Sequence, residues 1–300
     1  MPKKLMMGLF ALILIGLGII VLLLMRIPQK IDRENFTLNY TPLVQPDPTR
    51  GEVLYHLAGC GNCHLNRDPE SPIFATLAGG TPLETNFGNF VPPNITPDKP
   101  TGIGAWSDID FLNAMTRGVS PDGTHYYAAF PFTAYALMST EDILDIKAYL
   151  FSLDPVSYQA PKTDLVFPFN FRINNFIWKA MFFSDDKFVP DETKSEEWNR
   201  GAYIVNSLGH CGSCHTPRNI FTVEKSDQLF QGAPSLIPSE KPAPRIAGLD
   251  RDTILNGLDE WAGAVNENSS MYLVTQAYSQ YAPYSDLEAI ATYLSSLPPN

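Results

Sequence analysis

Cys60-Gly61-Asn62-Cys63-His64 and Cys211-Gly212-Ser213-Cys214-His215 repeat one pattern, and together they contain all four cysteines of the chain. The pattern C-x-x-C-H is the attachment signature of c-type haem: two thiols bond to the porphyrin, and the histidine that follows reaches the iron. The sequence therefore predicts two covalently bound haem c groups. The thiols would come from Cys60, Cys63, Cys211 and Cys214, and the first iron ligands would be His64 and His215.

Other uses of a C-x-x-C pair fit this sequence less well. A disulfide within each pair is an alternative, but it gives no reason for a histidine after both pairs. A four-cysteine zinc site usually has its pairs about 15–20 residues apart, and Cys63 and Cys211 are much further apart than that. A thioredoxin-type motif normally occurs once within a βαβ pattern, and no such pattern is visible.

The N-terminal sequence predicts a membrane anchor. Lys3 and Lys4 are followed by an uncharged run from Leu5 to Met25, which Arg26 ends. As a helix, this run would be about 31 Å long, enough to cross the hydrocarbon core of a bilayer. A cleaved signal peptide is the alternative, although its apolar core is usually shorter and ends at small residues.

The orientation of this anchor is taken from the haem motifs, because the positive charges that flank it are nearly balanced. Attachment of c-type haem occurs on the outer side of the bacterial cytoplasmic membrane. We therefore expect a single-pass protein of the cytoplasmic (inner) membrane, with its N-terminus inside and its haem domains in the periplasm.

Charge excludes one class of partner. The chain carries a net charge of −11; the first 27 residues hold three of the 21 Lys and Arg and none of the 32 Asp and Glu, leaving −14 on the remainder. Such a surface repels nucleic acid, as it does anionic lipid, and it can steer a basic redox partner. An acidic surface that only keeps the protein soluble explains this charge equally well.

Each motif lies inside a repeated unit. Arg50-Gly51 precedes the first motif and Arg200-Gly201 precedes the second, both in predicted helices. Each unit then closes with an amphipathic helical stretch after a capping-box pattern, Ser139–Asp142 in one case and Ser285–Glu288 in the other.

This arrangement resembles class I cytochrome c, whose first and last helices cross at a small residue. The resemblance implies that Gly51 packs against Tyr149 and Gly201 against Tyr293. It also implies an all-α fold: an N-terminal transmembrane helix followed by two tandem class I cytochrome c domains. The predicted ranges are 1–27 for the anchor, 28–46 for a linker, 47–157 for domain 1, 158–196 for an aromatic interdomain strap packed across both domains, and 197–300 for domain 2.

The sixth iron ligands are expected to be methionines close to the closing helices. Met271 is the choice for the second haem, because it precedes the closing helix and no other methionine lies in that unit. Met138 is the choice for the first haem. Its competitor, Met115, sits in a predicted helix and is expected to pack in the core. Among the other histidines, His125 is the alternative ligand that most needs testing.

Two prolines are candidates for supporting the motif histidines. Pro93 and Pro244 follow their motifs at comparable distances. In class I cytochromes c, a proline carbonyl at this place accepts the Nδ1 proton of the ligating histidine, which fixes its tautomer. An ordinary loop proline is the alternative at both positions. Arg218 is a further candidate, for holding a haem propionate.

A closer family resemblance rests on longer stretches. Asn94–Asp98, Thr101–Trp106, Ala148–Leu153 and His210–Asn219 look like the membrane-anchored dihaem cytochromes c, which are allied to the cytochrome subunits of periplasmic alcohol, aldehyde, sugar and gluconate dehydrogenases. The chain departs from many of those subunits in two ways: Phe130 stands where they carry a ligating methionine, and a third haem motif is missing.

The predicted function is electron transfer and not catalysis. Single electrons would come from a periplasmic dehydrogenase or a quinol and would pass to a soluble cytochrome, another carrier or a terminal oxidase. The alternative is a dihaem oxidase or peroxidase that acts on a small inorganic substrate at one open haem. We find no nucleotide-phosphate loop and no Ser/His/Asp spacing that would favour another enzyme class.

Overall fold

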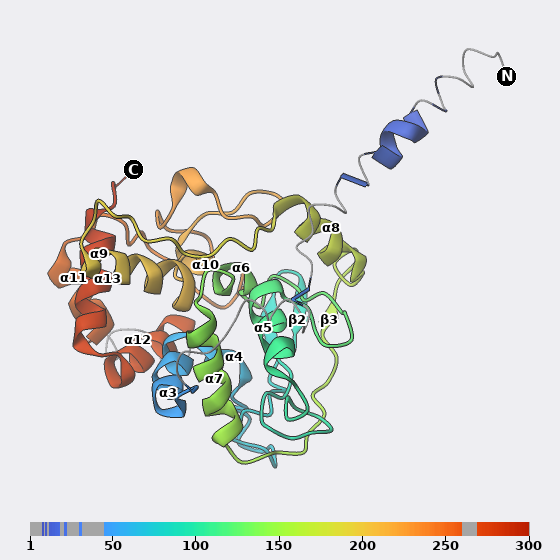
Figure 1. Ribbon diagram of the computed structural model, residues 1–300, viewed down its shortest axis with the longest axis horizontal. Helices are drawn as coiled ribbons and strands as arrows, with labels where there is room; N and C mark the ends of the chain where they lie inside the picture. Colours follow the sequence, from blue (N-terminus) through green and yellow to red (C-terminus); the bar gives the residue numbers. More distant parts are fainter. Residues whose placement is uncertain are drawn as a thin grey trace.

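A computed structural model describes residues 45–259 and 269–299, residues 30 and 31 and, near the N-terminus, residues 8, 10, 12–18 and 21–22. This part of the chain is mostly helical (Figure 1). We call residues 47–157 the first unit and residues 196–299 the second unit. The helices of the first unit are α3 (Pro48–Leu57), α4 (Cys60–His64), α5 (Asp108–Arg117), α6 (Phe132–Tyr135) and α7 (Thr140–Ser152).

One helix lies between the units, and the second unit repeats the helical order of the first. The connecting segment carries α8 (Ile173–Phe182). The second unit then contains α9 (Glu196–Tyr203), the π-helix η1 (Ile204–Leu208), α10 (Gly212–His215), the short 3-10 helix η2 (Ser226–Gln228), α11 (Arg251–Asp259), α12 (Ser270–Tyr281) and α13 (Tyr284–Ser296).

In the first unit, the opening helix α3 crosses the closing helix α7 at Gly51. A Cβ atom at this position would lie 1.9 Å from the carbonyl oxygen of Asp145 and 3.1 Å from Cβ of Tyr149. Only a residue without a side chain lets the two backbones approach so closely. The expected contact of Gly51 with Tyr149 is confirmed, and the crossing holds α3 in place directly before the first motif.

The second unit repeats this crossing between α9 and α13. A Cβ atom at Gly201 would lie 1.9 Å from the carbonyl oxygen of Ala289 and 2.9 Å from Cβ of Tyr293. The expected contact of Gly201 with Tyr293 is therefore confirmed as well.

The two closing helices begin differently. Ser139 caps α7 by accepting a hydrogen bond from the backbone N–H of Asp142. The capping role expected of Ser285 is wrong, because α13 begins one residue earlier, at Tyr284, and follows Pro283 without a side-chain cap. The backbone N–H of Asp286 in this first turn donates instead to the carbonyl of Pro283, at 2.8 Å.

Each crossing carries an arginine–aspartate pair. Arg50 of α3 pairs with both Asp142 and Asp145 of α7. Arg200 of α9 donates from Nε and Nη2 to the carboxylate of Asp286 in α13, at 2.8 and 2.7 Å. Two-point contacts of this kind fix the orientation of the paired side chains as well as their distance.

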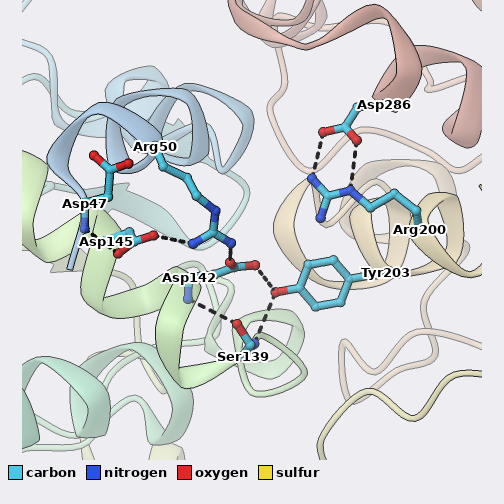
Figure 2. A network of polar contacts seen from close by, with 8 residues as sticks. All are labelled: Asp47, Arg50, Ser139, Asp142, Asp145, Arg200, Tyr203 and Asp286. Atoms are coloured by element: carbon cyan, nitrogen blue, oxygen red, sulfur yellow. Dashed lines mark hydrogen bonds and ion pairs between the residues drawn. The ribbon is translucent and has the colours of Figure 1, made fainter. Parts of the chain in front are cut away.

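A tyrosine joins the two crossings to each other. Figure 2 shows Tyr203 extending from α9 of the second unit toward the start of α7 in the first. Its hydroxyl donates to Oδ2 of Asp142 at 2.5 Å and accepts from the backbone N–H of Ser139 at 3.1 Å. The polar network of the first crossing therefore extends into the second unit.

A small sheet corrects the all-α prediction. The strands β1 (Leu83–Thr85), β2 (Gly88–Phe90) and β3 (Asp164–Leu165) pair antiparallel in the order β1-β2-β3. The third strand comes from the connecting segment and adds to a hairpin of the first unit. Strands of two or three residues are too short to show the alternation that reveals a strand in a sequence.

The segment 158–196, predicted to be an aromatic strap, contacts both units. Trp178 donates its indole N–H to the carbonyl of Phe221 at 2.8 Å, and Phe188 donates its backbone N–H to the carbonyl of Leu137 at 3.2 Å. However, several of its aromatic side chains are exposed, and Phe167 is 77% exposed. The segment therefore joins the units by particular contacts and leaves much of its apolar surface open. The predicted domain boundaries stay a prediction.

The two units also contact each other directly, through α12 and α3. Tyr278 donates its hydroxyl to the carbonyl of Leu57 at 3.2 Å. The ring of Tyr281 stacks on His56 with ring centroids 3.4 Å apart. Buried apolar residues of both units belong to one continuous cluster. The units are held together by packing as well as by the connecting segment.

The predicted N-terminal anchor falls largely outside the described residues. Within the residues that the structure describes, none of the helices combines the length and the apolar character needed to cross a bilayer. Most of the predicted linker, 28–46, also lies outside them. Its described residues dock on the first unit: Lys30 donates from Nζ to the carbonyl of Ser120 at 3.0 Å, and Ile31 exchanges two hydrogen bonds with the side chain of Asn113.

Candidate functional site

Both C-x-x-C-H motifs lie on short helices that follow an opening helix. The first motif forms α4, and the second forms α10 together with Cys211, its N-cap residue. Gly59 and His210 occupy the position before the first cysteine, with φ of 66° and 38°. A positive φ redirects the chain out of the opening helix and into the motif helix.

Each motif histidine is held by a proline carbonyl. Nδ1 of His64 lies 2.8 Å from the carbonyl oxygen of Pro93, and Nδ1 of His215 lies 2.7 Å from that of Pro244. A carbonyl oxygen only accepts hydrogen bonds, so Nδ1 carries the proton and Nε2 keeps a free lone pair. These are the contacts that the sequence analysis expected of the two prolines, and they leave Nε2 able to bind a metal.

The surroundings favour the neutral form of both imidazoles. Burial lowers the pKa of His64 and of His215, and the hydrogen bond to the proline carbonyl opposes this effect. A metal ligand must be unprotonated at the coordinating nitrogen. Tautomer, burial and protonation state therefore all agree with a ligand role, which stays a proposal for both residues.

Glycines that sequence reasoning missed position the two prolines. Gly79 donates its backbone N–H to the carbonyl of His64 at 3.0 Å, and Gly232 does the same to His215 at 2.8 Å. A Cβ atom at Gly79 would lie 2.7 Å from the carbonyl oxygen of Pro93. The signal that could have found them is a glycine 15 or 17 residues after each motif histidine.

Two arginines satisfy carbonyl groups of the motif helices. Arg67 donates from Nη1 to the carbonyl of Asn62 at 2.8 Å and from Nη2 to that of Gly61 at 2.9 Å. Arg218 donates to the carbonyl of Ser213 at 3.0 Å and pairs with Glu224 at 3.1 Å. The last carbonyls of a helix have no partner within it, so these bonds stabilise the short helices. Arg218 thus stabilises the helix of the second motif. The sequence analysis expected it only as a candidate for holding a haem propionate.

The four cysteines match the donor set of covalent haem c. All four thiols are free, which does not support the disulfide alternative. Burial raises the pKa of Cys60 and of Cys211 to about 12, whereas thiols used for disulfide exchange have a lowered pKa. Among the described residues, no three His, Cys, Asp or Glu side chains are arranged to hold a metal ion. The motifs therefore do not form a shared zinc site, and each offers two thiols and one imidazole.

The candidate sixth ligands lie in different surroundings. Met138 is 0% exposed and Met115, in α5, is 5% exposed. Both belong to the apolar cluster, so burial does not distinguish them. Met271 lies in the first turn of α12 and not in a loop, a helix that the sequence analysis did not anticipate. The ligand roles of Met138 and Met271 stay predictions.

Leucine substitutions distinguish these methionines. Met138→Leu and Met271→Leu are each expected to remove half of the methionine-to-iron charge-transfer absorption, because leucine has no sulfur. Met115→Leu is the matched control and should leave the band intact. A Met-to-Leu exchange costs less than about 1.5 kcal/mol, so the variants should fold. Loss of half the band in Met115→Leu would transfer the first ligand role to that residue.

The remaining histidines have packing partners. His125 lies edge-on to Phe176, His56 stacks on Tyr281, and His210 lies edge-on to Tyr135 with ring centroids 5.6 Å apart. Nδ1 of His125 also lies 3.1 Å from Nζ of Lys179. These contacts give all three a structural role. From the sequence, a structural role and a ligand role were both open for these histidines, but their packing partners could not be named.

Lys179 gives a pH-dependent prediction. Burial lowers the pKa of Lys179 to about 7, whereas lysine in an unfolded chain titrates near ~10.4. Between these values the unfolded chain binds more protons, so the free energy of unfolding should rise as the pH increases from about 7 to 10. Below about pH 7, Lys179 is protonated in both the folded and the unfolded chain, so it adds no gain in the free energy of unfolding.

The measurement is urea unfolding of the wild type and of Lys179→Met at about pH 6.5, 8 and 9.5. Titrating groups away from Lys179 are common to both proteins and cancel in the difference. The pKa of His125, which burial and the nearby Lys179 lower to about 4, lies below this pH range. This difference, wild type minus variant, should increase with pH. A flat or falling difference would show that the buried amine does not titrate in this range.

The two motifs lie next to each other. A Cβ atom at Gly59 would lie 3.9 Å from Nε2 of His210, so the residues that precede the two motifs face each other. Tyr135, which packs on His210, donates its hydroxyl to the carbonyl of Ala58 at 2.7 Å. Cofactors attached to these motifs would be close together, at a separation that side-chain packing fixes.

Comparison with known proteins shows which chains have a similar sequence. No protein-family model matches the chain. It is 37% identical over 259 residues to a protein of Cereibacter sphaeroides named "Diheme cytochrome c-type", and the match covers 84% of this chain and 86% of that protein.

Two longer proteins are also similar. The fructose dehydrogenase cytochrome subunit of Gluconobacter japonicus is 35% identical over 273 residues, which cover 85% of this chain and 53% of that protein. The gluconate 2-dehydrogenase cytochrome c subunit of Pantoea cypripedii is 34% identical over 268 residues, which cover 83% of this chain and 59% of that protein. The chain thus spans little more than half the length of these two relatives.

Proposed function

Because this chain belongs to the dihaem c-type cytochromes, we propose that it carries two covalently bound haems and passes single electrons from one to the other. It is an electron-transfer protein and not a catalytic subunit. Relatives named as the cytochrome subunits of fructose, gluconate and alcohol dehydrogenases support this role.

Each half of the chain would hold one haem. Cys60 and Cys63 would bind the first haem and His64 would ligate its iron, with Met138 as the proposed sixth ligand. In the second half these roles fall to Cys211, Cys214, His215 and Met271. Haem iron supplies one-electron chemistry when it is bound.

The protein groups around each site would set how readily the iron accepts an electron. The proline carbonyls keep each imidazole in the ligating tautomer, which also strengthens it as a ligand. The buried surroundings of His64 and His215 exclude water and so influence the potential of the iron.

The observation that carries the proposal is the side-by-side placement of two equivalent sites. The residues before the two motifs, Gly59 and His210, face each other across the contact between the units. A catalytic haem needs only one such site with an open position, whereas a pair in fixed proximity suits transfer between them.

The surroundings of this protein are proposed from its sequence and its relatives. The electron donor would be a periplasmic dehydrogenase or a quinol, and the acceptor a soluble cytochrome, another carrier or a terminal oxidase. The run Leu5–Met25 would anchor the chain in the cytoplasmic membrane with both haems in the periplasm. The acidic remainder would favour a basic soluble partner.

Haem stoichiometry tests the proposal. The purified chain should contain two haems that acid-acetone does not extract, and Cys60→Ser combined with Cys63→Ser should reduce this number to one. The pair Cys211→Ser and Cys214→Ser is the matched control and should give the same result. Extractable pigment or fewer than two haems in the wild type would contradict the proposal. Carbon monoxide binding readily to one ferrous haem would favour the oxidase alternative.

A further inference from the structure

Helix α8 presents an apolar stripe to solvent. Ile173, Ile177 and Met181 are 60%, 46% and 41% exposed, and their spacing of four residues places them on one helical face. Phe167 and Phe171, just before the helix, are 77% and 52% exposed. Contiguous exposed apolar surface of this kind normally meets another apolar surface.

The opposite face of α8 is fixed to the first unit. Lys179 is 1% exposed and donates from Nζ to the carbonyls of Arg117 and Gly118, at 2.6 Å each. Two residues turn a helix by about 200°, so Lys179 points away from Ile177 and Met181. The helix cannot rotate to bury its stripe without breaking these bonds, so the stripe is a fixed outward face.

The N-terminal part of the chain reaches the first unit beside this helix. Lys30 binds the carbonyl of Ser120, in the loop that begins at Gly118, where α8 is held. The uncharged run Leu5–Met25 ends five residues before Lys30, and five residues span at most about 17 Å. Figure 1 draws α8 on the same side of the molecule as the described residues 12–18. A membrane that holds the run would therefore lie close to α8.

The charge of this stretch fits a lipid surface. Residues 165–184, between Asp164 and Asp185, contain no Asp or Glu in a chain with a net charge of −11. Of their two basic residues, Lys179 is buried against the first unit, so Arg172 supplies the positive charge of the outward face. Arg172 is exposed. Anionic phospholipids attract arginine and repel carboxylates, and aromatic side chains are enriched at the boundary between lipid and water.

We propose that the apolar stripe of α8 lies in the headgroup region of the bilayer that holds the N-terminal run. Ile173, Ile177 and Met181 would contact the upper acyl chains, and Arg172 would pair with phospholipid phosphate, as in other interfacial helices. This inference rests on the proposed membrane anchor. Together, the two attachments would fix the orientation of both haem units relative to the membrane, which a single attachment would not do.

Photolabelling of the full-length holoprotein tests the inference. The protein is reconstituted into vesicles of phosphatidylcholine and phosphatidylglycerol that contain a diazirine phospholipid, and labelled peptides are mapped by mass spectrometry. Peptides from 165–184 should carry the label. In the triple variant Ile173→Gln, Ile177→Gln, Met181→Gln, the labelling of these peptides should fall roughly tenfold, because the apolar contact of α8 with lipid is lost. The variant should still float with the vesicles, because its N-terminal run is unchanged.

A matched variant carries the same number of substitutions elsewhere. Phe74, Leu236 and Tyr284 are 51%, 39% and 60% exposed and lie outside 165–184. Their replacement by glutamine should leave the labelling of α8 unchanged. The haem content of each variant shows that it has folded.

Two outcomes overturn the inference. In the first, the wild type floats while 165–184 stays unlabelled. In the second, a co-purified dehydrogenase protects this stretch from hydrogen exchange without any lipid, and the stripe is then a protein interface. If the full chain does not float, the anchor fails together with this inference. The electron-transfer proposal is decided separately by the number of haems.

Discussion

Alanine in place of His215 is expected to slow electron transfer through the chain by about 100-fold or more, and alanine in place of His64 should have the same effect. Loss of only the group that hydrogen-bonds a metal-binding histidine typically costs about 10–100-fold in metal affinity or activity. These variants lose the proposed ligand itself, together with its bond to the carbonyl of Pro244 or Pro93.

The measurement separates ligand loss from haem loss. The thiols would still hold both haems, so the number of haems per chain should stay at two while one of them becomes high-spin. Rapid-mixing reduction measures the rate of electron transfer, and electron paramagnetic resonance reports the spin state, while the haem content of the purified variant gives the number of haems. His56→Ala is the control, because His56 stacks on Tyr281 and has no proposed ligand role. Two low-spin haems in His215→Ala would contradict the ligand assignment.

The second large effect is expected at the helix crossings. In Gly201→Ala the new Cβ would lie 1.9 Å from the carbonyl oxygen of Ala289, and in Gly51→Ala it would lie 1.9 Å from that of Asp145. Overpacking usually costs about 1–3 kcal/mol. Here the obstacle is backbone that a rotamer change cannot move, so each substitution should lower the free energy of unfolding by ~3 kcal/mol or more.

Urea unfolding of the holoprotein measures this cost, and the yield of holoprotein should fall with it. Gly18→Ala is the matched control, because nothing lies within 4 Å of a Cβ atom at that helical position. It should not lower the free energy of unfolding, because alanine favours a helix over glycine by up to about 1 kcal/mol. A cost below about 1 kcal/mol at Gly201 would mean that the helices can separate without loss of packing.

Much of the candidate site could be predicted because its signals are local. The two motifs are contiguous, and the spacing of 29 residues from each histidine to its proline repeats in both units. The supporting contacts are less visible. Arg67 and Gly79 act through backbone carbonyl groups, so their roles depend on how the chain folds back and not on a recognisable pair of side chains.

The fold could be predicted where helical periodicity and a crossing glycine agree, as at Gly51 and Gly201. It could not be predicted where the partner is distant in the sequence. Tyr278 and Leu57 are separated by 221 residues, and no local pattern joins them. The sequence misplaces the start of α13 because Ser285–Glu288 has the composition of a capping box, whereas the helix already begins at Tyr284, directly after Pro283.

The contact between α12 and α3 has a consequence for dissecting this protein. Tyr278 and Tyr281 lie near the C-terminal end, yet they cover Leu57 and His56, which lead into the first motif. A fragment with only the first motif would lose this cover, and a fragment with only the second would turn two aromatic rings toward water. Single-haem truncations would therefore tend to aggregate or to pair again, and they would make poor stand-ins for the two centres of the intact molecule.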